Sequence, residues 1–175
     1  MKYVFTFDED RCSACGACRM GCIDQNDIDI ESGESCFRRT YEDEIELKDG
    51  GLYCVYLSAA CMHCENAPCI DACPAGCIKK DQETGFTVYD NTNCIGCKSC
   101  ALACPFGAPV FRKSDGKMVK CDGCNIRVKN GLKPACVRAC SFGALDCVAE
   151  ADFNASEGGK ACSQLLKNLG LQKYS

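Results

Sequence analysis

Four dense runs of cysteine constrain the fold of this chain more than any other feature of its sequence. Sixteen of the 21 cysteines in 175 residues lie in these runs, and a cysteine content of about 12% is far above that of ordinary globular domains. Without cysteine, apolar residues make up only roughly 35% of the chain, which is a small supply for a hydrophobic core. We therefore expect cysteine chemistry to organise the interior. The runs are group I (Cys12, Cys15, Cys18 and Cys22), group II (Cys61, Cys64, Cys69 and Cys73), group III (Cys94, Cys97, Cys100 and Cys104) and group IV (Cys121, Cys124, Cys136 and Cys140).

Three kinds of cysteine chemistry could fill such an interior: disulfides, zinc sites and iron–sulfur clusters. The opening residues MKYVFTFDEDRC lack the pattern of a secretory signal peptide, and an odd number of cysteines disfavours complete pairing in disulfides. Zinc prefers two separated Cys-x-x-Cys pairs around one ion, so it would leave the third and fourth thiols of each run unused. Only group IV, taken alone, keeps a zinc site as an alternative.

The spacing within the runs favours 4Fe-4S clusters. Groups I and III share the Cys-x2-Cys-x2-Cys-x3-Cys spacing of bacterial ferredoxins, and groups II and IV each lengthen one gap. Three thiolates at three-residue steps reach three irons of one cubane, and Gly16 and Gly96 let the backbone curl toward the inorganic sulfides. We expect the fourth cysteine to begin a helix that points away and to bind the neighbouring cluster, with the prolines after Cys73 and Cys104 setting the turn. The sequence thus predicts four 4Fe-4S clusters held by all sixteen grouped cysteines.

The charge distribution is compatible with buried anionic centres. The formal net charge is −4, and each cubane with its four thiolates adds about −2. Residues 112–138 nevertheless contain eight basic side chains against two acidic ones, whereas residues 1–50 are strongly acidic. A basic segment can indicate nucleic-acid binding, but no aromatic residues are interleaved with this one. We therefore expect cations and amides of residues 112–138 to lie beside group IV and to raise reduction potentials there.

Matching spacings divide the chain into two similar parts. Groups I and III agree in spacing and groups II and IV are their lengthened companions, so the sequence predicts an internal repeat with two clusters in each unit. Short β-rich segments at 2–7, 51–57 and 85–90 precede groups I, II and III. The predicted fold is α+β, with duplicated bacterial-type 2x(4Fe-4S) ferredoxin-like units built of short strands, cluster loops and short helices. The expected organisation is one unit of residues 1–22 plus 105–150, a second of residues 54–104, an acidic insertion at 23–53, and a tail at 151–175 with an amphipathic helix at 158–170 capped by Gly170.

Several longer motifs resemble one family. CMHCENAPC, CPAGCI, GFTVYD, CIGCKSCALACPFGAP, KCDGC and PACVRACSFGALD follow one another as in the four-cluster iron–sulfur subunit of molybdopterin oxidoreductases, in particular that of the dimethyl sulfoxide reductase family. The resemblance extends from Tyr3 to about Val148. It implies that group I shares its clusters with group IV, and group II with group III. The implied cluster-binding sets are Cys12, Cys15, Cys18 and Cys140; Cys121, Cys124, Cys136 and Cys22; Cys61, Cys64, Cys69 and Cys104; and Cys94, Cys97, Cys100 and Cys73.

The sequence departs from that family's pattern in two ways. Ser141 and Ile23 stand where such subunits usually carry a proline after the fourth cysteine, so we expect a looser turn at group IV. The C-terminal tail of longer members is missing, which weighs against a direct membrane anchor. The longest uncharged stretch, from Gly50 to Cys64, is also too short to span a bilayer.

The remaining reactive residues do not form a substrate site. His63 stands between two group II cysteines, where it could donate to a cluster, move protons or be an ordinary loop residue. No phosphate-binding loop, dinucleotide fingerprint or nucleophile constellation is present in the sequence. Five cysteines lie outside the runs and are expected to serve as small apolar residues, with a redox-sensing or catalytic thiol as the alternative. They are Cys36, Cys54, Cys77, Cys147 and Cys162.

Redox centres without a substrate site predict an electron-transfer subunit rather than an enzyme. The resemblance implies that the protein connects a large molybdopterin (Mo/W) catalytic subunit with a membrane quinol-reactive subunit. It also implies membrane association through these partners, at the outer face after co-export with a signal-bearing partner, with a cytoplasmic location as the alternative. No direct membrane span and no nucleic-acid partner are expected. A free polyferredoxin, or an accessory electron carrier of a hydrogenase or formate lyase, has the same cysteine runs and remains an alternative, as does a structural cluster or zinc protein.

Overall fold

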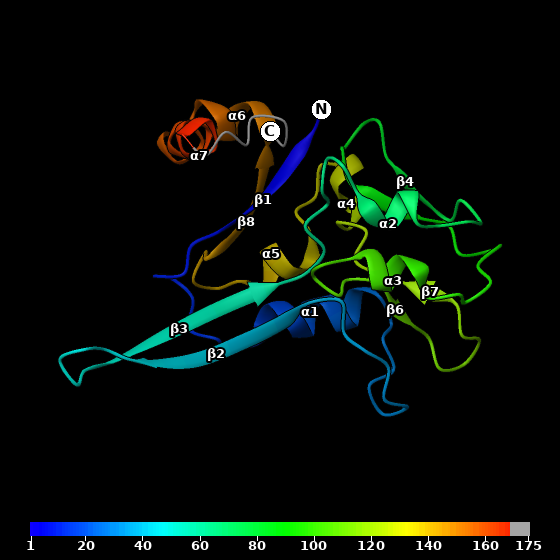
Figure 1. Ribbon diagram of the computed structural model, residues 1–175, viewed down its shortest axis with the longest axis horizontal. Coiled ribbons are helices and arrows are strands. Elements are labelled where there is room, and N and C mark those ends of the chain that lie inside the picture. The colour runs from blue at the N-terminus through cyan, green and yellow to red at the C-terminus, as the bar shows by residue number, and fades with distance from the viewer. Residues whose placement is uncertain (169–175) are drawn as a thin grey trace.

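A computed structural model describes residues 1–168 of the chain, which form an α+β structure of short elements (Figure 1). The strands are β1 (Tyr3–Phe7), β2 (Arg39–Glu46), β3 (Leu52–Ala59), β4 (Ile78–Lys80), β5 (Thr87–Tyr89), β6 (Val110–Phe111), β7 (Met118–Val119) and β8 (Leu145–Ala149). The helices are α1 (Ala17–Gln25), α2 (Pro68–Asp71), α3 (Ser99–Ala103), α4 (Asn125–Lys129), α5 (Ala135–Ala139), α6 (Glu150–Ala155) and α7 (Glu157–Asn168). The strands form antiparallel pairs, β1 with β8, β2 with β3, β4 with β5 and β6 with β7, and each pair is a sheet of its own.

The three β-rich segments predicted from the sequence are confirmed as β1, β3 and β5. Alternating aromatic and β-branched residues favour extended backbone in these segments. In the β1–β8 pair, Tyr3 lies opposite Ala149 and Phe7 opposite Leu145. Because the group I loop follows β1 directly and the last cysteine of group IV precedes β8, this pairing brings the two runs together.

The β4–β5 turn connects two parts of the molecule. Asp81 accepts hydrogen bonds from the backbone amides of Glu83 and Thr84, at 3.1 and 3.0 Å, which fixes the turn. Its other carboxylate oxygen lies 2.7 Å from Lys129 Nζ and 3.2 Å from Asn125 Nδ2. Since both of these residues belong to α4, Asp81 ties the β4–β5 hairpin to the group IV loop.

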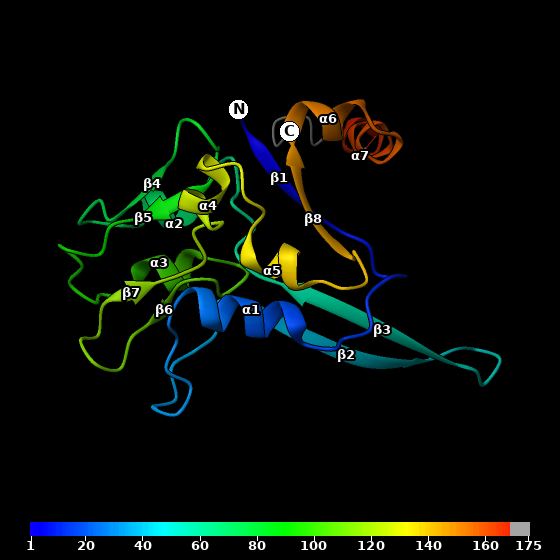
Figure 2. The same cartoon turned by 180° about the vertical axis from the view of Figure 1, so that it is seen from behind.

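The β2–β3 hairpin, here called the arm (residues 39–59), projects away from the other elements (Figures 1 and 2). β2 lies within residues 23–53, the segment expected to be an acidic insertion. The register places Tyr41 opposite Leu57 and Ile45 opposite Tyr53, so these side chains share one face, and each is between 44% and 48% exposed. A lone two-stranded ribbon is marginally stable in water. We therefore expect another surface to cover this apolar face. The opposite face carries Glu42, Glu44 and Glu46 from β2, which lie opposite Tyr56, Cys54 and Leu52 of β3.

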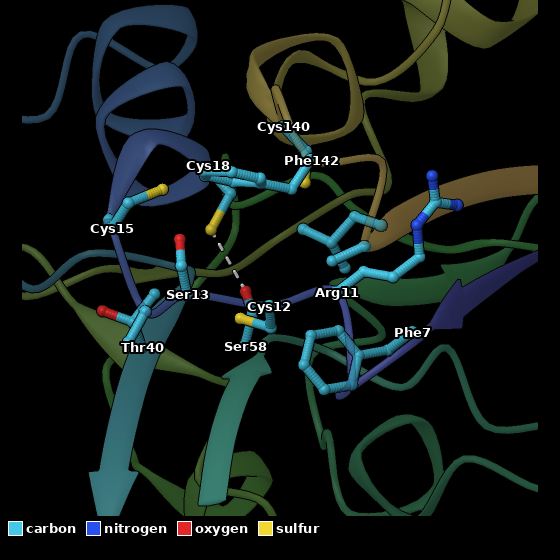
Figure 3. Close-up of a pocket in the computed structure, with 14 residues that line it drawn as sticks. Phe7, Arg11, Cys12, Ser13, Cys15, Cys18, Thr40, Ser58, Cys140 and Phe142 are labelled. Atoms are coloured by element: carbon cyan, nitrogen blue, oxygen red, sulfur yellow. Dashed lines mark hydrogen bonds between the residues drawn. The ribbon is translucent and has the colours of Figure 1, made fainter. Parts of the chain in front are cut away.

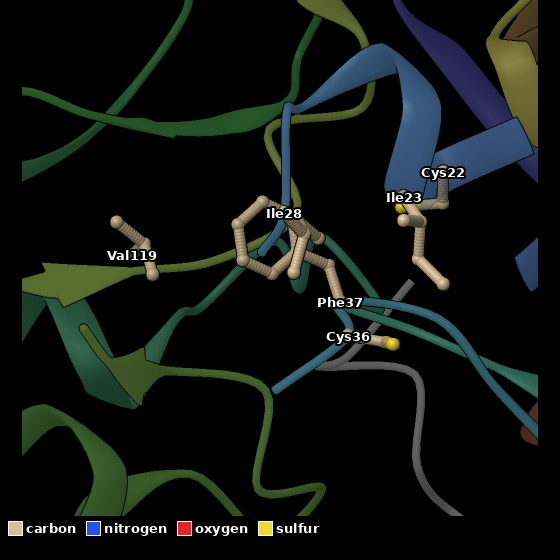
Figure 4. Close-up of a cluster of buried hydrophobic side chains, with 6 residues drawn as sticks. All are labelled: Cys22, Ile23, Ile28, Cys36, Phe37 and Val119. Atoms are coloured by element: carbon tan, nitrogen blue, oxygen red, sulfur yellow. The ribbon is translucent and has the colours of Figure 1, made fainter. Parts of the chain in front are cut away.

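The interior is divided into three small clusters of buried side chains, and cysteine takes part in each. Figure 4 shows the first cluster, in which Ile23, Ile28 and Phe37 pack with Cys22 and Cys36. Grouped cysteines also belong to the other two clusters, so cysteine contributes to every part of the core. This agrees with the expectation from a sequence that is poor in other apolar residues.

The C-terminal helices α6 and α7 lie beside the β1–β8 pair (Figure 1). The predicted C-terminal helix is confirmed as α7, and its predicted cap, Gly170, lies outside the described residues. Within residues 1–168, no helix combines the length and the apolar character required to cross a bilayer.

Candidate iron–sulfur cluster sites

The group I loop encloses a cavity together with one cysteine from a distant run (Figure 3). Cys12, Cys15 and Cys18 line about 320 Å³ of space that protein atoms leave unfilled, and Cys140 of group IV is the fourth thiol in its wall. Gly16, which precedes α1, has a φ of 75°, a left-handed conformation that permits the tight loop. The structure thus brings a group IV cysteine to the group I loop.

Two further cavities show the same arrangement between groups II and III. They comprise about 330 and 300 Å³ of space that protein atoms leave unfilled, respectively, part of it open to solvent. The short helices α2 and α3, which lead to the fourth cysteines of these runs, contact each other. Each loop therefore receives one thiol from the other run. The first cavity is lined by Cys61, Cys64, Cys69 and Cys104. The second is lined by Cys73, Cys94, Cys97 and Cys100, and also by Cys77, which lies outside the four runs.

The four remaining grouped cysteines also lie near one another. Burial, and then the neighbouring thiols of Cys136 and Cys124, raise the pKa of the Cys22 thiol to about 12. Burial also raises the pKa of Cys121, and the Cys22 thiol contributes to that shift. Helix α1, which carries Cys22, contacts α5, which carries Cys136. A group I cysteine is thereby brought to the group IV loop.

The fourth cysteine of a run does not begin a helix, so that expectation is wrong. Cys104 and Cys140 are the C-terminal caps of α3 and α5, and Cys22 lies inside α1. The third cysteine of these runs is already helical, and about one helical turn separates it from the fourth. This rise along the helix, rather than a new helix, carries the fourth thiol to a different cavity.

The turn after the fourth cysteine is the same with and without proline. The amide of Gly107 donates to the carbonyl of Cys104, and the amide of Gly143 to that of Cys140, both at 3.2 Å. Ser141 therefore does not loosen the group IV turn, contrary to the expectation. Group I differs from both, because α1 continues past its fourth cysteine.

Backbone amides donate hydrogen bonds to thiols in several of these sites. Such donors favour the thiolate form and, in iron–sulfur proteins, raise reduction potentials. The donors belong to loops and strand ends, whose amides are not used within helices or sheets. The pairs are Gly123 N with Cys121 Sγ at 3.4 Å, Met118 N with Cys94 Sγ at 3.3 Å, Cys77 N with Cys73 Sγ at 3.3 Å, and Ala108 N with Cys104 Sγ at 3.5 Å.

Sequence reasoning missed Ser58, which contacts the group I site, and Arg38, which contacts Ser58. Arg38 is buried, and its Nη1 donates to the carbonyl and the Oγ of Ser58 at 3.1 and 3.0 Å. Ser58 Oγ lies 3.2 Å from Cys18 Sγ. Arg38 lies in the segment assigned to the acidic insertion and Ser58 follows it in β3, so only their position in the fold reveals the contact.

A single basic side chain of residues 112–138 is buried, and its charged group lies against group II rather than against a group IV thiol. Lys120 is 1% exposed, and its Nζ is 3.8 Å from the Sγ of Cys61. Elsewhere in this segment, Lys133 pairs with Asp146 at the surface. The basic residues of this segment were expected beside group IV, but the charged group of Lys120 lies beside a group II thiol instead.

His63 connects the group II loop with group IV. The amide of Thr87 donates to its Nδ1 at 3.0 Å, so the proton of the neutral ring is assigned to Nε2, which lies 3.7 Å from the Sγ of Cys121. Burial, followed by the nearby charge of Lys120, lowers the pKa of His63 well below its ordinary value, which favours this neutral form. The geometry thus supports donation to a thiol among the alternatives for His63.

The five cysteines outside the runs differ in exposure. Cys36 and Cys77 are buried, as expected of small apolar residues, and Cys147 is half-buried. Cys54 and Cys162 are exposed. Cys54 lies in β3 as predicted, but on the acidic face of the arm, so its expected role as an apolar residue is not fulfilled.

The donors present fit 4Fe-4S clusters. Each of the three cavities has four grouped cysteines in its wall, as a cubane that takes one thiolate on each iron requires, and Cys77 is a fifth thiol in the wall of the group III cavity. The Oγ1 of Thr87, in the wall of the group II cavity, is buried without a hydrogen-bond partner, and a cluster sulfur would provide an acceptor for it. Among the described residues, no three His, Cys, Asp or Glu side chains are arranged to hold a single metal ion.

Comparison with known proteins agrees with this chemistry. The 4Fe-4S dicluster domain family matches residues 52–150. The B subunit of the anaerobic dimethyl sulfoxide reductase of Escherichia coli is 41% identical over 152 residues, which cover 83% of the present sequence and 72% of that protein. The thiosulfate reductase electron transfer subunit PhsB of Salmonella typhi is 35% identical over 151 residues, 83% of the present sequence and 77% of that protein. The iron–sulfur subunit of the nitrate-inducible formate dehydrogenase of Escherichia coli is 33% identical over 152 residues, 79% of the present sequence but 51% of that protein.

These comparisons confirm the resemblance found in the sequence. The relatives are named as components or as electron transfer and iron–sulfur subunits of oxidoreductases, which agrees with an electron carrier that is not itself the catalytic subunit. The cofactors of this protein are 4Fe-4S clusters, and four of them account for the sixteen grouped cysteines. The protein belongs to the 4Fe-4S dicluster family and, within it, to the iron–sulfur electron-transfer subunits of oxidoreductase complexes.

Proposed function

We propose that the protein conducts electrons along a row of four 4Fe-4S clusters, each bound by three cysteines of one loop and one cysteine of another run. When bound, each cluster supplies a centre that gains and loses one electron. The protein holds these centres at fixed positions and in fixed order. The proposed sets are Cys12, Cys15, Cys18 and Cys140 for group I; Cys121, Cys124, Cys136 and Cys22 for group IV; Cys61, Cys64, Cys69 and Cys104 for group II; and Cys94, Cys97, Cys100 and Cys73 for group III.

The exchange of fourth cysteines between neighbouring sites is the observation that carries this proposal. Groups I and IV exchange theirs through the adjacent helices α1 and α5, and groups II and III through α2 and α3. Between the two pairs, His63 of the group II loop lies 3.7 Å from Cys121 of group IV. These contacts support the order I, IV, II, III along the row.

The exchanges also support a duplicated architecture. In this proposal, residues 1–22 plus 105–150 form one ferredoxin-like unit with groups I and IV, and residues 54–104 form the other with groups II and III. Residues 23–53 form the insertion that contributes β2, and residues 151–175 form the C-terminal tail. Asp81 and Lys129, 2.7 Å apart, connect the second unit to the first.

The partner that we propose is a large molybdopterin-containing catalytic subunit. The dimethyl sulfoxide reductase, thiosulfate reductase and formate dehydrogenase relatives are named as parts of oxidoreductases, and none of the cavities described here holds a substrate-binding constellation beside its thiols. The apolar face of the arm supports assembly with another protein, because water is an unfavourable neighbour for Tyr41, Ile45 and Tyr53. The base of the arm lies at the group I site, where Ser58 contacts Cys18.

We further propose that the complex is held at a membrane by a quinol-reactive subunit, at the outer face after co-export with a signal-bearing partner. In that arrangement the quinol-reactive subunit provides the membrane span. A free polyferredoxin, or an accessory carrier of a hydrogenase or formate lyase, is the competing function. The competing function predicts that the protein is stable without a large subunit.

Co-purification from native cells tests this function. The wild-type protein should bring down a large molybdenum- or tungsten-containing subunit and hold about sixteen irons and sixteen acid-labile sulfides. Replacing the apolar face of the arm (Tyr41→Ser, Ile45→Ser and Tyr53→Ser) should release the large subunit while the iron content stays. The opposite-face control (Glu42→Ser, Glu44→Ser and Glu46→Ser) should retain it. Purification of the wild-type protein alone, as a carrier that serves several enzymes, would contradict the proposal.

A further inference from the structure

Two basic side chains, Lys120 and Arg38, are buried without a carboxylate partner among residues 1–168, and of these two only Lys120 lines one of the three cavities with four grouped cysteines. Lys120 is 1% exposed and lines the cavity of the group II thiols. Its Nζ donates to the carbonyls of Cys121, at 2.8 Å, and of Thr87, and lies 3.8 Å from the Sγ of Cys61. Within residues 1–168, Lys120 forms no salt bridge with Asp or Glu. Because a buried cation requires compensating negative charge, its counter-ion belongs in the cavity that it lines.

Thr87 contributes a second polar group to the same cavity. Its backbone groups are already engaged, since its carbonyl accepts from Lys120 and its amide donates to His63. Its Oγ1 is buried and has no hydrogen-bond partner. The hydroxyl hydrogen is therefore available for an acceptor inside the cavity, as is the charge of Lys120.

The other two cavities lack such an enclosed pair. Lys98 lines the group III cavity and Arg11 lines the group I cavity, but both side chains are exposed to solvent. Water and salt screen exposed charges, whereas a buried charge acts at nearly full strength on its neighbours. Of these three sites, group II thus receives the strongest positive field from a lining side chain.

We propose that Lys120 and Thr87 form a resident electropositive site for the group II cluster, with the ammonium group as its counter-ion and the hydroxyl as a donor to one of its sulfurs. The proposal rests on the group II ligand set given above. Positive charge and hydrogen-bond donors stabilise the reduced, more negative state of a cluster, so both groups raise its reduction potential. Among the clusters of groups I, II and III, the group II cluster is then the one whose potential a buried lining side chain raises.

The test is a redox titration followed by paramagnetic resonance on the complex purified from native cells. The group II signal is first assigned through a Cys64→Ser variant. Lys120→Met removes the charge but keeps an unbranched side chain, and Thr87→Val removes the hydroxyl but keeps the shape. Thr87→Ser retains the hydroxyl, and Lys113→Met removes an exposed charge from the β6–β7 hairpin, so these two variants serve as controls.

We expect Lys120→Met and Thr87→Val to shift the group II midpoint to lower potential, with smaller shifts at the other clusters and full iron content. Both controls should titrate as the wild type does. If Lys120→Met loses iron, the inference is tested by the difference in group II midpoint potential between Thr87→Val and Thr87→Ser. An unchanged group II potential in the variants that keep their clusters, or equal shifts at all four clusters, would overturn the inference. A wild-type iron content near twelve with stoichiometric zinc would instead overturn the ligand sets, which distinguishes failure of the proposed function from failure of the tuning.

Discussion

Ser58 Oγ, at the base of the arm, lies 3.2 Å from Cys18 Sγ in the group I loop. Arg38 Nη1 donates to the same hydroxyl oxygen at 3.0 Å, so the hydroxyl hydrogen of Ser58 is left for the sulfur. Arg38 is 4% exposed and, among residues 1–168, forms no salt bridge. A buried cation is therefore connected to a cluster-binding thiol through one hydroxyl.

Replacement of Ser58 by Ala should lower the reduction potential of the group I cluster. The variant loses the donor to Cys18, and a hydrogen bond of about 1 kcal/mol corresponds to a shift on the order of tens of millivolts for one electron. Redox titration of the group I signal measures this shift. An exposed control, Ser114→Ala, should leave the potential where it is, and an upward shift in Ser58→Ala would show that the hydroxyl does not donate to the sulfur.

Replacement of Cys22 by Ser should disturb the group IV cluster and leave the group I cluster with all its ligands. The reason is that Cys22 lies near Cys124 and Cys136, whereas Cys140 joins the group I loop. Paramagnetic resonance of the reduced variant, with signals assigned by separate loop variants, shows whether the group IV or the group I cluster is altered. Loss of the group I signal would show that the fourth cysteines are not exchanged.

Gly123→Ala should prevent the protein from binding its group IV cluster. Gly123 has a φ of 76°, and a Cβ at this position would lie 2.4 Å from the ring of Phe86, a fully buried side chain that would have to shift. The matched control is Gly131→Ala, because Gly131 has a φ of 72° with no atom within 4 Å of an added Cβ. Iron analysis should find about one cluster less in Gly123→Ala only. Equal losses in both variants would assign the effect to backbone strain alone.

Asp81→Asn should destabilise the protein by about 2 kcal/mol, because it weakens the connection between the β4–β5 hairpin and α4. Burial opposes ionisation of Asp81, but hydrogen bonds from Lys129, Thr84 and Asn125 hold its pKa well below the ordinary value. A depressed pKa stabilises the folded state fully above the unfolded pKa of about 4, and this contribution disappears as the pH falls through the folded value.

The loss of stability caused by Asp81→Asn should therefore be constant between pH 6 and 8. It is measured as a drop in the apparent Tm, of roughly 4–8 °C, followed by cluster absorbance. Glu83→Gln is the control, since Glu83 is largely exposed and lies 3.5 Å from the same lysine. A difference that grows as the pH rises from 6 to 8 would contradict the assignment to Asp81.

Local patterns were enough to predict the strands at 2–7, 51–57 and 85–90 and the C-terminal helix. Each depends on the alternation or the helical periodicity of its own residues, which neighbouring residues do not alter. β2 was missed because RTYEDEIE is mostly charged. Tyr41 and Ile45 alternate with acidic residues, but they lie on an exposed face rather than in the core. A strand of this composition does not differ from a solvated loop until its partner strand is known.

The sequence was enough to predict 4Fe-4S clusters, but not the polar residues that surround the cysteines. The spacing of the thiols predicts cubanes, because each loop is a local structure. Ser58 contacts the group I loop, Arg38 contacts Ser58, and Thr87 lines the group II cavity, but these positions depend on the fold. Thr87 lies in the motif GFTVYD, which predicts a strand and says nothing of a cluster contact. Likewise, the position of Cys140 in the group I cavity depends on the β1–β8 pairing, which joins the first and last strands of the described structure.

The central claim is that the protein connects a physiological electron donor with a separate catalytic subunit. The most direct measurement compares two activities in cells that make the catalytic subunit with and without this protein: reduction by a viologen dye and reduction by the physiological donor. The account predicts that removal of the protein abolishes the physiological reaction and leaves much of the dye-linked one, because the dye feeds the catalytic centre directly. Retention of the physiological reaction in its absence would contradict the account.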